Sequence, residues 1–260
     1  MYASLASLEV GLGVAFSKTF HEFWKAHVPD KTPLFEVQKR KLGGAFGRRG
    51  PHPSKPGWWL IEIEQNLPYS VHPENTLAHE IVHLVLEKEG YPVIWSPEPP
   101  KGRIWENIAS ELHSILTHPV IWMRMREWGF PVDDHIRIKA TGQLGDLQRM
   151  DLRRKAPKRK QFPDWQLWIL KYILARLEWG EPERTQIYEV FAKPSITVIG
   201  KHGEKYVKQL DSLDYFEPQK LTPQTVKEAG ERLLKDLKLN VYFSLKTLEE
   251  LKQSPHLKSH

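Results

Sequence analysis

Three residues of the sequence HEIVH, namely His79, Glu80 and His83, have the types and the spacing of a metal centre. Residues four apart on an α-helix leave the same face, so both imidazoles could bind one Zn²⁺ ion in a tetrahedral site. Glu80 would lie one step around the helix, beside the position of a bound water molecule. The arrangement is typical of a zinc hydrolase, in which the metal activates the water and Glu80 acts as general base.

The sequence around this motif predicts the helix that must position it. Apart from the two histidines and Glu80, residues 77–86 are all apolar, which is typical of a buried helix. Pro73 suits the first turn of a helix, and Gly90 suits its end. Two histidines and a glutamate in the middle of a buried helix need polar partners, which a metal and its water would supply. The alternative is a pair of hydrogen-bonded core histidines.

A catalytic zinc needs a third protein ligand, and the next predicted helix, within residues 103–130, offers two glutamates. Glu111 lies on a polar stripe of this helix with His118, which could orient a ligand or act as an extra one. Glu106 lies on a second polar stripe, beside small residues that would let two helices approach closely. We expect Glu111 to be the third metal ligand, with Glu106 as the alternative.

The motif and the helix that follows it resemble the gluzincin metallopeptidases, in particular minimal gluzincins and the ImmA/IrrE group, over about residues 34–130. In that group a glutamate precedes small and apolar residues up to a proline, an order echoed here by Glu106, Ala109, Leu112, Leu116 and Pro119. A second likeness, to short bacterial zinc-peptidase-like proteins with a polar helix ending in His and then Val-Ile, favours Glu111 and His118. The resemblance implies a zinc-dependent peptidase.

Peptide or amide hydrolysis also needs a donor that stabilises the negative charge on the substrate carbonyl oxygen. A histidine, tyrosine or arginine could serve, and the candidates near the motif or after it are His113, His118, Tyr69, His72 and His135. Each of them could equally be a surface or structural residue.

The fold expected from the sequence is α+β, with a small mixed or antiparallel sheet packed on the HExxH helix. Residues 34–68 read as two extended stretches separated by a basic loop rich in glycine and proline. Residues 59–64 alternate partly between apolar and charged side chains, as a half-buried strand does. This strand could form the sheet edge on which a substrate lies, although a scaffold strand is the more ordinary interpretation.

Composition and charge divide the 260 residues into two predicted parts, a zincin-like metallopeptidase domain at 1–150 and a mainly helical extension at 151–260. The division coincides with a basic run that could contact a polyanion or act as a solvated linker: Arg153, Arg154, Lys155, Lys158, Arg159 and Lys160. Within the extension, residues 195–208 read as two short strands around a turn.

The chain contains no cysteine, so histidines and carboxylates are its only strong metal ligands. No apolar run is long enough to span a bilayer, and the first residues lack the features of a signal peptide. These observations predict a cytoplasmic Zn²⁺-dependent peptidase that acts on a peptide or protein without a membrane partner. The alternative is a non-catalytic zinc-binding module that docks nucleic acid or an acidic protein.

Overall fold

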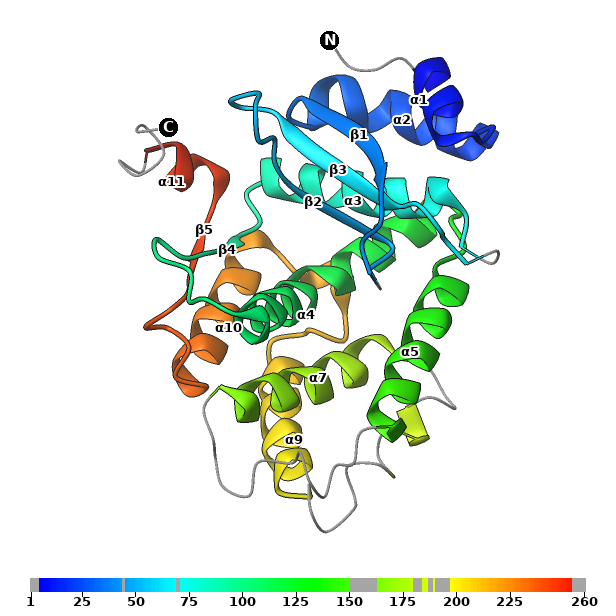
Figure 1. The fold of residues 1–260 in the computed structure, drawn as a ribbon. Coiled ribbons are helices and arrows are strands. Elements are labelled where there is room, and N and C mark those ends of the chain that lie inside the picture. Colours follow the sequence, from blue (N-terminus) through cyan, green and yellow to red (C-terminus); the bar gives the residue numbers. More distant parts are fainter. Residues whose placement is uncertain are drawn as a thin grey trace. The chain divides into compact units, whose positions relative to one another are not determined.

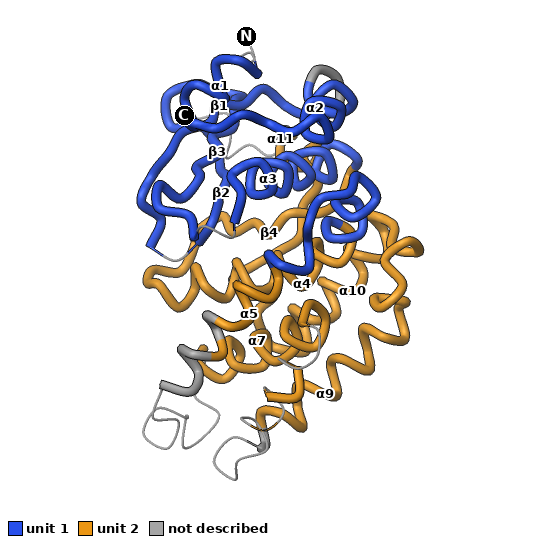
Figure 2. The backbone as a smooth tube through the Cα atoms, turned by 90° about the vertical axis from the view of Figure 1, so that its right-hand side faces the viewer, with its two compact units in different colours: residues 1–89, 121–135 blue, residues 90–120, 136–260 orange. Residues whose placement is uncertain are grey.

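A computed structural model describes residues 5–43, 45–68, 71–149, 163–179, 184–186, 189 and 197–253 of the protein. They form two compact units, one of residues 1–89 with 121–135 and the other of residues 90–120 with 136–260 (Figure 2). Helix α4 (Arg103–Glu127) contains the boundary at residue 120 and is continuous through it. The predicted division at residue 150 lies at residues outside the described part and stays a prediction.

The first unit begins with helices α1 (Leu5–Leu12) and α2 (Lys18–Lys31), followed by a small mixed sheet (Figure 1). The strands are β1 (Phe35–Arg40), β2 (Gly47–Pro51) and β3 (Trp59–Glu64), in the order β1-β3-β2. Strand β3 pairs in parallel with β1 and antiparallel with β2. The predicted strand at 59–64 is confirmed, but it is the central strand, so the idea that it forms a sheet edge is wrong.

Helix α3 (Pro73–Lys88) contains the HEIVH motif and contacts both β2 and β3. Its start is fixed locally, because the His72 side chain accepts a hydrogen bond from the backbone N–H of Glu74 and Pro73 occupies the first turn. Gly90 follows the helix with a φ of 94°, a conformation that glycine adopts without steric cost. Every residue from 75 to 87 is buried, as the apolar sequence predicts.

The rest of the first unit comprises the end of α4 and the start of α5 (Val132–Arg149). In the second unit, the short strands β4 (Val93–Trp95) and β5 (Ser244–Lys246) pair antiparallel. The described helical elements after residue 150 include α7 (Asp164–Glu178), α9 (Thr197–Asp211), the 3₁₀-helix η1 (Pro218–Lys220), α10 (Pro223–Asp236) and α11 (Leu248–Gln253). The coarse expectation of a mixed α+β protein is therefore confirmed.

Helix α9 occupies the segment for which the sequence predicts two short strands, so that prediction is wrong. Its buried residues are spaced as one face of a helix: Ile199, Gly203, Tyr206, Val207 and Leu210. A Cβ atom on Gly203 would lie 2.3 Å from Cδ1 of Tyr172 in α7. The glycine thus permits the close approach of α9 to α7, which contact each other.

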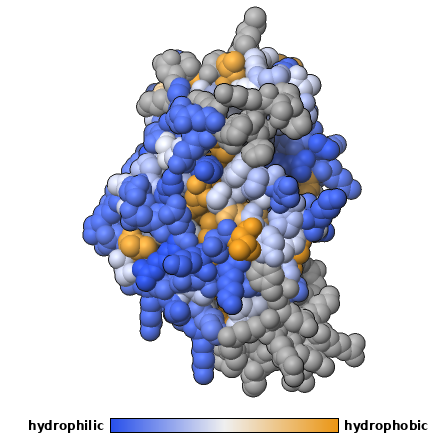
Figure 3. Space-filling view, turned by 90° about the vertical axis from the view of Figure 1, so that its left-hand side faces the viewer, coloured by the Kyte–Doolittle hydropathy of each residue, from blue (hydrophilic) through white to orange (hydrophobic). Residues whose placement is uncertain are grey.

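The described surface shown in Figure 3 is largely hydrophilic, and apolar side chains appear on it in limited areas. None of the described helices combines the length and the apolar character needed to cross a bilayer.

Candidate metal centre

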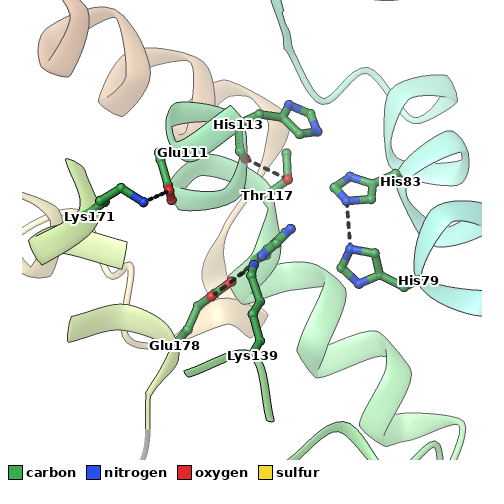
Figure 4. A network of polar contacts seen from close by, with 9 residues as sticks. His79, His83, Glu111, His113, Thr117, Lys139, Lys171 and Glu178 are labelled. Carbon is green, nitrogen blue, oxygen red and sulfur yellow. Dashed lines mark hydrogen bonds and ion pairs between the residues drawn. The ribbon is translucent and has the colours of Figure 1, made fainter. Parts of the chain in front are cut away.

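Helix α3 places the His79 and His83 rings side by side, one helical turn apart (Figure 4). Their Nε2 atoms are 3.1 Å apart, and their planes are nearly perpendicular, at 81°. Both residues are buried, with 8 % and 3 % of their surface exposed. The spacing of four residues therefore produces the converging pair that the sequence predicts.

Helix α4 supplies a third imidazole. The Trp122 ring of α4 lies against His79, with 4.6 Å between the ring centroids. His118 precedes Trp122 by four residues on this helix, a spacing of about one helical turn. One possible ligand atom from each of His79, His83 and His118 lies within 4.8 Å of those of the other two. Among the described residues, these three buried histidines could hold a metal ion.

The spacing of the His79 and His83 nitrogens is compatible with tetrahedral coordination of one metal ion. Two imidazole nitrogens that each lie about 2.0–2.1 Å from a Zn²⁺ ion in a tetrahedral site are about 3.3–3.4 Å apart. The distance of 3.1 Å between the Nε2 atoms of His79 and His83 is close to that value. Imidazole nitrogens suit zinc and several other first-row transition metals. The three imidazoles therefore suit such an ion, and the spacing of the histidine pair on α3 fits it.

A carboxylate lies on the other side of the His118 ring. Glu178 of α7 forms a hydrogen bond through Oε1 with Nδ1 of His118, and both side chains are buried. Lys139 of α5 completes this group, with its Nζ 3.7 Å from Oε2 of Glu178. Because Nδ1 contacts Glu178, a metal ion would be bound through Nε2 of His118.

The two glutamates considered as third ligands lie elsewhere on α4. Glu111 accepts a hydrogen bond from Nζ of Lys171 at 2.9 Å, and Figure 4 shows its side chain directed toward that lysine. It precedes His118 by seven residues, which is about 10.5 Å along a helix axis. Glu106 is exposed in the first turn of α4. The structure thus brings His118, rather than Glu111 or Glu106, to the histidine pair.

Glu80 lies on a different face of α3, toward strand β2. Oε2 of Glu80 is 3.7 Å from Nη1 of Arg49, and the same guanidinium donates a hydrogen bond from Nε to Oε1 of Glu87 at 3.1 Å. Glu87 follows Glu80 by two helical turns, so one arginine serves both buried carboxylates. A Cβ atom on Gly47 would be only 3.0 Å from Oε1 of Glu80, so a glycine permits β2 to approach here.

Of the histidines and the tyrosine proposed as further donors, His135 lies nearest to the pair within the first unit. Its ring is stacked nearly parallel to that of His79, with 6.1 Å between centroids and an interplanar angle of 14°. Phe46 packs edge-on against His135 at 4.9 Å. His72 caps α3, His113 is half-buried on α4, and Tyr69 lies outside the described residues.

Sequence reasoning missed three residues of this region: Arg49, Trp122 and Glu178. A signal existed only for Trp122, which follows His118 by one helical turn. The basic residues 153–160, predicted to contact a polyanion, lie outside the described part of the chain.

No family model, curated protein or solved structure shows significant similarity to this sequence. The function must therefore be inferred from the residues of the site.

Proposed function

We propose that the protein is a zinc-dependent peptidase in which His79, His83 and His118 hold the metal and Glu80 is the general base. The observation that carries the proposal is the group of three buried histidines, within 4.8 Å of one another, on the HEIVH helix and its successor. His118 takes the role that the sequence predicted for Glu111. Three neutral imidazoles match one of the ligand sets used by catalytic zinc.

Held by His79, His83 and His118, a zinc ion would lower the pKa of a bound water molecule to about 7 and would polarise a carbonyl oxygen. Glu80 follows His79 directly, and its buried carboxylate is neutralised by Arg49 at 3.7 Å. In the proposed reaction Glu80 accepts a proton from the attacking water and returns it to the leaving nitrogen. Arg49 offsets the cost of keeping this carboxylate buried and ionised.

Two further observations favour catalysis over a closed structural site. The group of possible ligands found among the described residues contains three histidines and no fourth side chain, which suits a position reserved for water. Strand β2 lies at an edge of the sheet, and its Gly47 is next to Glu80. A peptide backbone could pair with such an edge as an additional strand. These features support peptide bonds as the substrate class.

The proposal is tested by replacing Glu80→Gln and incubating the zinc-loaded protein with a peptide library whose products are identified by mass spectrometry. The variant should keep its zinc and lose cleavage by about 10²–10⁴-fold, the usual contribution of a general base. Glu106→Gln, which removes an exposed carboxylate from α4, is the matched control and should cleave like the natural protein. Equal cleavage by Glu80→Gln and the control would remove Glu80 from the mechanism.

A further inference from the structure

We infer that Glu178 is a positioning residue that orients His118 toward the metal, so that helix α7 contributes to metal affinity. The inference rests on the proposed function only in that the three histidines hold a metal ion. Glu178 itself does not belong to the group of possible ligands; it acts through the imidazole of His118.

The contact between Glu178 and His118 leaves one ring nitrogen with a defined role. An ionised carboxylate can only accept a hydrogen bond, so Nδ1 of His118 must be the donor. A neutral imidazole that carries its proton on Nδ1 presents a lone pair at Nε2, the form that binds a metal. The carboxylate therefore selects the tautomer and fixes the rotation of the ring.

Burial strengthens the hydrogen bond between Glu178 and His118. The side chains of His118 and Glu178 expose 6 % and 2 % of their surfaces, so water competes little for either group. Lys139 from α5, with its Nζ 3.7 Å from Oε2 of Glu178, compensates the negative charge. Histidine ligands of metals commonly donate their second ring nitrogen to a carboxylate, and loss of such a partner lowers metal affinity by about 10–100-fold.

A suitable control carboxylate is present on α9. Oε1 of Glu204 accepts hydrogen bonds from the Tyr172 hydroxyl at 2.5 Å and from Nε of Arg176 at 2.9 Å. Both donors lie on α7, the helix that carries Glu178. Glu204→Gln thus perturbs the packing of α7 through a polar contact but leaves the partner of His118 in place. It separates a general effect on this helix from a specific effect on the metal ligand.

The experiment is a Co²⁺ titration of the full chain, followed by its visible absorption bands, which report the coordination of the ion. Glu178→Gln should weaken Co²⁺ binding by about 10–100-fold and alter the bands. Glu178→Asp should recover part of the affinity, and Glu204→Gln should bind like the natural protein. If Glu178→Gln does not fold by circular dichroism, Glu178→Asp is titrated instead, and it should bind Co²⁺ more weakly than the natural protein because its shorter side chain draws the carboxylate away from Nδ1 of His118.

The outcomes separate this inference from the proposed function. Unchanged Co²⁺ affinity and bands in Glu178→Gln, or in Glu178→Asp as its substitute, would overturn the inference while leaving the metal site intact. A loss of affinity equal to that of Glu204→Gln would also overturn it. Failure of the natural protein to bind Co²⁺ would overturn both the inference and the metal site. Weakened binding in Glu178→Gln without any peptidase activity would support the inference and count against the function alone.

Discussion

The close approach of strand β2 to the HEIVH helix at Gly47 can be tested by the substitution Gly47→Ala. The new Cβ atom would lie 2.7 Å from Cγ2 of Thr76 and 3.0 Å from Oε1 of Glu80. Carbon atoms in favourable contact are about 3.5–4.0 Å apart, so the strand or the helix must move by about 0.8 Å or more. Thr76 is completely surrounded, with 1 % of its surface exposed, and cannot turn into solvent.

The expected cost follows from a comparison within one strand. Overpacking of a well-packed site costs about 1–3 kcal/mol. Replacing glycine by alanine also stabilises the protein by about 0.4–1 kcal/mol, because the unfolded chain becomes less flexible. Gly50→Ala in the same strand gains that second contribution without crowding, since nothing lies within 4 Å of its Cβ position. The difference between the two variants should therefore be about 1–3 kcal/mol.

Urea unfolding at 25 °C measures both free energies of unfolding, and zinc content reports whether the helix still presents its histidines. Thr76→Ser removes the Cγ2 atom, so Gly47→Ala should cost less in that background, with a coupling energy of about 0.5–3 kcal/mol. If Gly47→Ala and Gly50→Ala differ by less than about 0.5 kcal/mol, within the range of an ordinary surface substitution, the close contact is refuted.

Two further predictions concern charges beside the sheet. Arg49→Met should lower the free energy of unfolding by about 3–5 kcal/mol in urea, because Glu80 and Glu87 lose their buried cation. Arg48→Met removes a half-exposed partner and should cost only about 1 kcal/mol, so equal losses would contradict the reasoning. Burial raises the pKa of Glu62, but hydrogen bonds from Arg48 and two neighbours outweigh this and hold the pKa below 4.5. The ionised Glu62 therefore stabilises the folded state at a pH above its unfolded pKa, and this stabilisation is lost as the pH falls through the folded pKa. In Glu62→Gln, the free energy of unfolding should decrease less steeply as the pH falls. An identical pH profile in the variant and the natural protein would contradict this prediction.

Local signals in the sequence were sufficient for helix α3 and strand β3. Pro73 begins α3 and Gly90 lies just beyond its end, so local signals mark both ends of this helix without tertiary context. Strand β2 was missed because GRRGP has low intrinsic strand propensity; it becomes a strand by pairing with β3, in the register Gly47 opposite Ile63. The short apolar segments of α9 fit the period of a strand as well as that of a helix. The close packing of Gly203 against Tyr172 of α7 favours the helix.

The sequence predicts the site residues that lie one helical turn apart. It does not predict contacts between residues that are far apart in the sequence. His79 and His83 converge because they are four residues apart. The spacing of Glu111 and His118 predicts that they share one face of α4. It does not predict which turn of that helix supplies a metal ligand. Among the described residues, the group of possible metal ligands contains His118, and Trp122, one helical turn further along α4, packs on His79. Glu178 is 60 residues from His118, so nothing in the local sequence pairs them.

The three-histidine metal centre is tested most directly by the zinc content of the purified, metal-reconstituted chain, measured by inductively coupled plasma mass spectrometry. We predict equimolar Zn²⁺ in the natural protein, its loss in His118→Ala, and its retention in Glu111→Ala, with all three folded by circular dichroism. Zinc retained by His118→Ala but lost from Glu111→Ala, or absent from the natural protein, would contradict a metal centre formed by the three histidines.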